Sequence, residues 1–283
     1  MKDNIRILLV DGSNLLFQMF FGMPARIVNR DGKAIQGTLG FVGALLKIIR
    51  RTEPTHIAVI FDGEHENDRK QLDSEYKANR TDFGRVPEEE NPFSQLTDVY
   101  AALDFLRICH TETMDCETDD IIAGYAQKCG GFAEIVISSF DSDFFQLITD
   151  KVSVLRYRGE KTILCTPDYV EEKFGVAPSQ YADFKALVGD TADHIKGAEK
   201  IGPKTASALL KKYGSLQEII ENAHMIQKPS VRDSVVRNAE RLNINYKLIR
   251  LEKYAELPFA LEELRYHYNG VTTNEVLQGI GLR

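Results

Sequence analysis

The chain has 283 residues, 43% of them hydrophobic, which is enough for one large domain or two ordinary ones with packed cores. Its formal net charge of −7 at pH 7 is opposite in sign to the basic excess that nucleic-acid-binding proteins usually show. No run of about 18 apolar residues occurs, and the first apolar run ends at Asp11, so we expect neither a membrane span nor a signal peptide.

Cysteine usage indicates a reducing compartment. A chain of this size does not need disulfides, and its four cysteines show no C-x-x-C pair: Cys109, Cys116, Cys129 and Cys165. We therefore predict free thiols, no zinc site and a cytoplasmic protein.

Three short apolar runs, residues 5–10, 57–61 and 134–137, are typical of buried parallel strands. Each is followed by acidic residues, namely Asp11, Asp62, and the pair Asp141 and Asp143. Because ligands of parallel sheets bind beyond the carboxyl ends of the strands, these aspartates are expected to converge on one site.

Helical patterns at residues 40–51, 92–106 and 119–128 lie between these runs. Strands that alternate with helices predict an α/β fold with a mostly parallel sheet flanked by helices. A hairpin is expected over residues 154–165.

The second half of the chain is typical of helices and loops. Helical patterns at residues 181–188, 204–213 and 222–250 surround a glycine-containing stretch at residues 189–203. We therefore expect three parts: an α/β domain over residues 1–175, a helical subdomain over residues 176–260, and a C-terminal tail over residues 261–283 that packs on the core.

Nine acidic residues stand at the expected strand ends and helix starts: Asp11, Asp62, Glu117, Asp119, Asp120, Asp141, Asp143, Asp190 and Asp193. A single aspartate after a strand is usually a turn residue or a helix cap. The whole set instead indicates magnesium, which prefers oxygen ligands. Two such ions about 3.5–4 Å apart can activate an attacking water and stabilise a leaving oxygen, as in phosphodiester hydrolysis.

The pattern at residues 117–120 leaves one orientation open. Glu117 and Asp120 are spaced to share a helix face, whereas Asp119 would point away unless the helix begins there. His110 and His194 are interpreted as structural, because magnesium prefers oxygen. With the nine acids assigned to metal ions, the remaining chain carries a small positive charge, which removes the objection to nucleic-acid binding.

Seven motifs, in this order, resemble the 5′ nuclease (flap endonuclease) family, which includes the N-terminal nuclease domain of bacterial DNA polymerase I. They are LLVDGSNLLF (residues 8–17), VIFDG (59–63), YKANR (76–80), ETDDIIA (117–123), DSDFFQL (141–147), LVGDTADHIKG (187–197) and IGPKTA (201–206). Thr118 and His194 depart from the family's usual Ala and Asn, but neither change removes a carboxylate.

The resemblance implies a PIN-like nuclease domain followed by a helix-hairpin-helix-type (helix-three-turn-helix) subdomain. It implies two Mg²⁺ ions, for which Mn²⁺ can substitute. One ion would be held around Asp11, Asp62, Glu117, Asp119 and Asp120, and the other around Asp141, Asp143, Asp190 and Asp193.

A glycine-rich turn that opens a helix offers free backbone N–H groups to a phosphate. Its residues are Lys196, Gly197, Lys200, Gly202, Lys204 and Thr205. The turn imitates a P-loop but fails that pattern at Pro203. The resemblance implies a grip on the duplex backbone without sequence reading, with K⁺ held by loop carbonyls; a plain helical hairpin is the alternative.

Basic residues with an interleaved tyrosine follow the second aspartate strand: Arg69, Lys70, Tyr76, Lys77 and Arg80. Such a set can stack a base and neutralise phosphate, although a charge run alone is usually a solvated face. By the resemblance, Lys77 and Arg80 also belong to the catalytic site, and a single strand threads an arch here. The acidic residues 88–90 depart from the family's usual continuation. Phe17, Phe20 and Phe21 are expected mainly to pack, with base stacking as the alternative.

The leading hypothesis is a freestanding, monomeric nuclease that hydrolyses DNA at a 5′ flap, a nick or a single-stranded 5′ end, in replication or repair. An RNA-cutting PIN-type nuclease is the second hypothesis, and the expected duplex-gripping subdomain argues against it. A DNA-binding protein without catalysis is the third, and the intact carboxylates argue against it.

Overall fold

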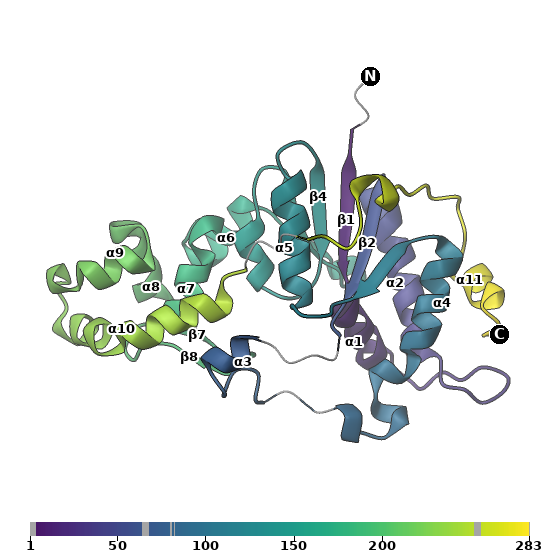
Figure 1. The fold of residues 1–283 in the computed structure, drawn as a ribbon, viewed down its shortest axis with the longest axis horizontal. Coiled ribbons are helices and arrows are strands. Elements are labelled where there is room, and N and C mark those ends of the chain that lie inside the picture. Colours follow the sequence, from purple (N-terminus) through teal and green to yellow (C-terminus); the bar gives the residue numbers. More distant parts are fainter. Residues whose placement is uncertain (1–3, 64–67, 80, 82, 252–255, 283) are drawn as a thin grey trace.

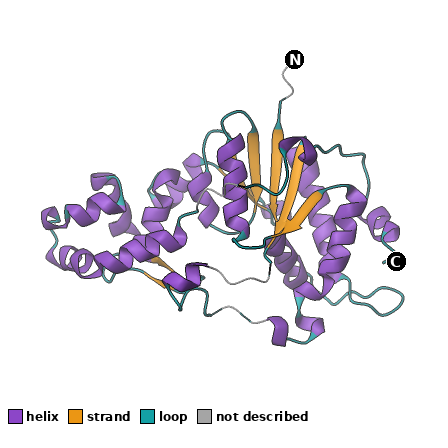
Figure 2. Cartoon of the chain, viewed as in Figure 1, coloured by secondary structure: helices purple, strands orange, loops and turns teal. Residues whose placement is uncertain are grey.

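A six-stranded sheet forms the centre of the molecule in the computed structural model, which describes all residues except 1–3, 64–67, 80, 82, 252–255 and 283 (Figures 1 and 2). The strands lie in the order β3-β2-β1-β4-β5-β6. Their bounds are Arg6–Asp11 (β1), His56–Phe61 (β2), Cys109–Glu112 (β3), Glu134–Ser138 (β4), Val152–Arg156 (β5) and Ile163–Cys165 (β6). All pairs are parallel except β5 with β6, so the predicted sheet and hairpin are confirmed.

The central strand β1 is buried on both faces, which explains its continuous apolar sequence. Its side chains alternate between two cores: Ile7 and Leu9 pack on one face, and Leu8 and Val10 pack on the other. Strand β3 was not predicted from the sequence. Its four residues are only partly buried and include no apolar run.

Helices cover both faces of the sheet. One core joins the sheet to α1 (Gly12–Gly22), α2 (Gln36–Thr52) and α4 (Leu96–Leu106). The other core joins it to α5 (Thr118–Cys129) and α6 (Pro167–Phe174). Each predicted helix of this region is present, with bounds that differ by a few residues.

The helical part extends to one side of the sheet (left in Figure 1). It contains α7 (Tyr181–Val188), α8 (Pro203–Tyr213), α9 (Leu216–Glu221), α10 (Pro229–Ile249) and the short strands β7 (Gly189–Asp190) and β8 (Ile195–Lys196). The buried amide of Asn245 on α10 donates to the carbonyls of Ala186 (3.1 Å) and Lys196 (2.9 Å). These bonds hold α10 against α7 and the β7–β8 turn. The predicted helical second part is confirmed.

The C-terminal segment returns to the sheet. Tyr266 N–H donates to the carbonyl of Thr55 at 2.8 Å, and α11 (Thr273–Gly279) packs on α2 and α4 through the buried Val276. The remaining short elements are α3 (Asp68–Leu72) and the 3₁₀ helices Phe83–Arg85, Glu88–Glu90, Pro92–Gln95, Asp143–Leu147, Gly159–Lys161, Pro178–Gln180, Ala223–Met225 and Leu261–Leu264. Within the described residues, no helix is both long enough and apolar enough to cross a membrane.

Candidate active site

Asp11 is fixed at the carboxyl end of β1. It is 6% exposed and caps α1, accepting a hydrogen bond from Asn14 N–H at 3.0 Å. Its second oxygen accepts from the Ser139 hydroxyl at 2.8 Å. The first turn of α1 and the residue that follows β4 therefore hold this carboxylate in one orientation.

Five acidic side chains line one hollow of about 450 Å³ at this edge of the sheet: Asp11, Asp62, Glu117, Asp119 and Asp141. We call these five the first acidic group. They come from the ends of β1, β2 and β4 and from the start of α5. The predicted convergence of the strand-end aspartates is therefore seen in the fold.

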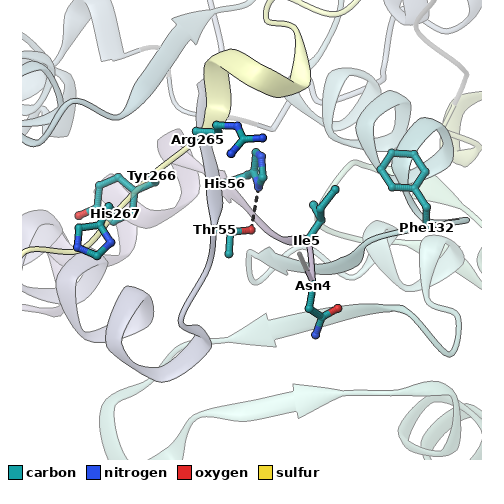
Figure 3. Close-up of a pocket in the computed structure, with 8 residues that line it drawn as sticks. All are labelled: Asn4, Ile5, Thr55, His56, Phe132, Arg265, Tyr266 and His267. Atoms are coloured by element: carbon teal, nitrogen blue, oxygen red, sulfur yellow. Dashed lines mark hydrogen bonds between the residues drawn. The ribbon is translucent and has the colours of Figure 1, made fainter. Parts of the chain in front are cut away.

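A larger hollow, of about 1160 Å³, lies where β1 and β2 begin, at the opposite edge of the sheet. Figure 3 shows Thr55, His56 and Arg265 in its wall, with the Thr55 hydroxyl 2.8 Å from Nδ1 of His56. Among the described residues, no acidic side chain lines it. The smaller hollow is therefore the candidate active site.

The start of α5 settles the orientation of Asp119. The helix begins at Thr118, directly after Glu117, so Asp119 and Asp120 lie in its first turn, where negative charge is favoured. Asp119 lines the hollow. Asp120 instead forms an ion pair with Arg69, with 2.8 Å between its Oδ1 and the guanidinium nitrogen. Thr118 N–H donates to Asp62 at 3.3 Å, which links α5 to the end of β2.

The charge balance differs within the first acidic group: Glu117 pairs with Arg69 and Lys77, whereas Asp11, Asp119 and Asp141 lie close together. Burial and the neighbouring Asp62 raise the pKa of Asp11 to about 7. Burial and Asp141 raise the pKa of Asp119 above its usual range. In the part of the chain that the structure describes, no basic side chain forms an ion pair with Asp11, Asp119 or Asp141. Clustered carboxylates without counter-ions fit hard divalent cations.

A second acidic group lies beside the first and consists of Asp143, Asp190 and Asp193. One oxygen of each lies within 4.8 Å of the others. Asp143 N–H donates to Asp141 at 2.8 Å, so Asp141 lines the first hollow and also contacts the second group. The resemblance implied Asp141 for the second ion only, whereas in the structure it lies between the two groups.

Lys185 is the site residue that sequence reasoning missed. It is 6% exposed, and its ammonium forms ion pairs with both Asp143 and Asp190. Burial raises the pKa of Asp143 to about 7, although Lys185 opposes the rise. Burial also raises the pKa of Asp190, but the Lys185 ammonium more than offsets it, so the net pKa lies below the usual range. The available signal was a lysine within the otherwise buried stretch of residues 181–187.

Basic residues of the 69–77 segment lie among the carboxylates. Arg69 is 8% exposed and pairs with Glu117 and Asp120, and Lys77 also pairs with Glu117. Lys77 N–H donates to the Asp193 carbonyl at 3.0 Å, so this segment touches both acidic groups.

The remaining residues of the predicted basic set differ in their exposure to solvent. Tyr76 is 3% exposed, with its hydroxyl 3.3 Å from Glu117, so the expectation that its ring stacks on a base is corrected: the ring has no free face. Lys70 is exposed. Arg80 lies outside the described residues.

An aromatic wall adjoins the hollow. Phe17 and Phe83, with ring centroids 5.6 Å apart, line it together with Phe93. Phe20 is buried, as expected for packing, whereas Phe17 and Phe21 are exposed. Phe17 and Phe83 are therefore available to contact a bound molecule.

The predicted glycine-rich turn runs from β7 to α8. A Cβ on Gly197 would lie 2.2 Å from the Val188 carbonyl, so only glycine fits there. Exposed members of the turn are Lys196, Lys200, Gly202 and Lys204, and Gly197 and Thr205 are partly buried. Gly202 is the N-cap residue of α8. The Lys196 ammonium lies 3.6 Å from a carboxylate oxygen of Glu75.

Two family models match consecutive parts of the chain. One, described as "5'-3' exonuclease, N-terminal resolvase-like domain", matches residues 6–175; the other, "5'-3' exonuclease, C-terminal SAM fold", matches residues 176–270. The chain belongs to the 5′-3′ exonuclease family. The resemblance stated from the motifs is confirmed.

Among curated relatives, the thermostable DNA polymerase I of Thermus thermophilus is 34% identical over 259 residues, covering 91% of this chain and 30% of the polymerase. DNA polymerase I of Rhizobium leguminosarum is 35% identical over 273 residues, covering 93% of this chain and 26% of the polymerase. The chain thus spans less than a third of the length of these relatives.

Solved structures share the fold. Bacteriophage T5 5′-exonuclease with bound divalent zinc ions superposes with a TM-score of 0.72 at 23% identity, covering 87% of this chain and 89% of that chain. A T5 flap endonuclease complex with DNA and metal ions has the same TM-score, identity and coverage. The catalytic core of Rad2 in complex with a DNA substrate has a TM-score of 0.59 at 14% identity, covering 98% and 85%.

Proposed function

We propose that the chain is a divalent-metal-dependent 5′ nuclease that hydrolyses DNA phosphodiester bonds at 5′ ends or 5′ flaps, in replication or repair. The observation that carries the proposal is the first acidic group, whose Asp11, Asp119 and Asp141 form no ion pair with a basic side chain in the described part of the chain. Membership of the 5′-3′ exonuclease family supports the same reaction class.

The proposed cofactors are two Mg²⁺ ions, with Mn²⁺ able to substitute. The first acidic group would hold one ion, and the second acidic group with Asp141 would hold the other. When bound, such ions supply a more acidic water and stabilise negative charge on the leaving oxygen. Asp120, which pairs with Arg69, would act on the site indirectly.

The chain's own side chains would orient the carboxylates and neutralise the charge of a bound phosphate. Ser139 and Asn14 orient Asp11, and the ion pairs of Arg69 and Lys77 orient Glu117. The Lys77 ammonium lines the hollow, where it would neutralise a phosphate held beside the carboxylates. Arg80 is proposed to share this role from outside the described residues. The exposed ring of Phe17 would cover an unpaired base at the junction.

The helical part is proposed to grip the duplex. Lys196, Lys200 and Lys204 are exposed around the start of α8, where free N–H groups and positive helix-dipole charge favour phosphate. Lys200 adopts φ 65°, in the left-handed region, within the turn where we propose that K⁺ binds backbone carbonyls.

The proposed division is a nuclease domain over residues 1–175, a DNA-gripping subdomain over residues 176–260 and a tail over residues 261–283. The junction of the two family models at residue 175 supports the first boundary. The free thiols of the four cysteines support the proposal of a cytoplasmic protein, and a monomer is proposed with it.

The test is incubation with 5′-labelled flap, nicked and single-stranded DNA, and with an RNA flap, in Mg²⁺ or EDTA. The wild type is expected to cut DNA in Mg²⁺ alone. Asp119→Asn should abolish cutting, because it removes charge from the hollow, whereas Asp150→Asn, at an exposed position outside it, should not. Absence of Mg²⁺-dependent cutting would refute the proposal, and a strong preference for RNA would refute its substrate class.

A further inference from the structure

The two acidic groups differ in their internal charge balance. In the first group the ion pairs fall on Glu117 alone among its five members within the described ranges, whereas in the second group the ammonium of Lys185 pairs with two of the three carboxylates, Asp143 and Asp190. Lys185 lies on α7, whose residues 181–187 are all buried. A buried ammonium requires close anionic partners, and here Asp143 and Asp190 provide them.

The hydrogen bonds of Asp190 show what a metal ion would have to displace. Its Oδ1 accepts from Ala192 N–H at 2.9 Å, and its Oδ2 pairs with Lys185. Lys185 also pairs with Oδ1 of Asp143. A divalent ion held by Asp143, Asp190 and Asp193 would therefore lie beside the Lys185 ammonium, and two neighbouring cations repel strongly in a buried site.

From these contacts we propose that Lys185 is a resident counter-ion of the second acidic group and exchanges with the divalent cation there. This inference rests on the proposed two-metal function and adds the order of loading. In the first acidic group the basic partners Arg69 and Lys77 lie on Glu117, and within the described residues Asp11, Asp119 and Asp141 form no ion pair that a metal ion would have to displace. The second group binds an ion only when Lys185 leaves its carboxylates.

The exchange needs movement of the lysine side chain alone. The backbone of α7 is held by the Asn245 bond to the Ala186 carbonyl, at 3.1 Å, and by packing on α10. The four flexible methylenes of the lysine side chain let the ammonium leave these carboxylates while α7 stays fixed. Lys185 is thus a positioning residue that sets how readily the second ion binds.

The experiment measures Mn²⁺ binding by electron paramagnetic resonance, with the full chain and without DNA. We expect two classes of site in the wild type, one tight and one weaker. Lys185→Met should tighten the weaker class by about tenfold or more, because it removes the competing buried charge. Lys185→Arg keeps the charge and should resemble the wild type. Lys128→Met, which removes an exposed lysine at the other end of α5, is the matched control.

Unchanged or weaker binding at the second class in Lys185→Met would overturn the proposal. Should Lys185→Met fail to fold in EDTA, a second measurement on the wild type decides: acetylation of Lys185, followed by mass spectrometry. The acetylation rate of Lys185 should rise on addition of Ca²⁺, while the acetylation rate of Lys128 stays constant. An unchanged rate at Lys185 would overturn the exchange.

These measurements are independent of cleavage. A wild type that shows the exchange but does not cut DNA would refute the proposed function and leave the exchange standing. A wild type that cuts DNA in Mg²⁺ while Lys185→Met binds Mn²⁺ as the wild type does would refute only the exchange.

Discussion

At the scale of single residues, Asp11 shows how this site favours cations. Its carboxylate is buried, anchored by Asn14 and Ser139, and close to Asp62. Folding therefore raises its pKa from 3.8 to about 7. A bound divalent ion would favour the ionised form and remove this cost.

The pH dependence of stability follows from this shift. Between about pH 4 and pH 7 the folded chain keeps a proton on Asp11 that the unfolded chain has released. In EDTA the free energy of unfolding should therefore fall as pH rises through this window and change little above it. Urea denaturation at several pH values should show a smaller fall for Asp11→Asn than for the wild type. An equal fall in both proteins would contradict the assignment.

Arg69 provides a second prediction at this scale. Its guanidinium pairs with Glu117 and Asp120 together, and Arg69→Met would leave the buried Glu117 and the partly buried Asp120 without this partner. The free energy of unfolding in EDTA should drop by about 3–5 kcal/mol. The adjacent Lys70 is exposed, and Lys70→Met should change it by less than about 0.5 kcal/mol. Similar effects of the two substitutions would show that Arg69 does not stabilise the site.

At the scale of elements, the sequence predicted the strands and helices that have a clear hydrophobic pattern of their own. The apolar runs of β1, β2 and β4 and the helix of residues 181–188 were found where expected. Strand β3 was missed because it owes its place to pairing with β2 rather than to its own hydrophobicity. Lys185 was missed because its burial depends on Asp143, one of its two acidic partners, which is 42 residues away in sequence.

The β7–β8 element depends on a close backbone approach. A Cβ added at Gly197 would lie 2.2 Å from the Val188 carbonyl, whereas one at the exposed Gly131 would meet nothing within 4 Å. Gly197→Ala should therefore lower the free energy of unfolding by about 1–3 kcal/mol or more. Gly131→Ala should change it by less than about 0.5 kcal/mol. Thermal denaturation compares the two, and equal melting temperatures would contradict the packing described.

At the scale of the whole molecule, acidic and basic side chains gather in different places. The chain has a formal net charge of −7, yet its acidic residues gather at one edge of the sheet and exposed lysines surround the start of α8. The sequence predicted both sets. The resemblance implied a catalytic place for Lys77, but the sequence could not show that Arg69 and Lys185 lie inside the acidic site, because their ion pairs with Glu117 and Asp143 join segments distant in sequence.

Lys204 tests the proposed grip. Lys204→Ala should weaken binding to a DNA duplex of any sequence and lower the salt-dependence slope by about 1, because one phosphate contact is lost. Lys128→Ala, at an exposed position on α5, should leave both quantities unchanged. Fluorescence anisotropy across salt concentrations measures them, and an unaltered slope for Lys204→Ala would remove this lysine from the DNA interface.

Asp141 links the two acidic groups, so its removal tests most directly whether they act as one catalytic centre. The measurement is single-turnover cleavage of a 5′-flap DNA in Mg²⁺ by the wild type and Asp141→Ala, with flap affinity determined alongside. The predicted result is a loss of about a thousandfold or more in rate, equivalent to about 4 kcal/mol, with DNA binding retained. Cleavage by Asp141→Ala at the wild-type rate would contradict the account.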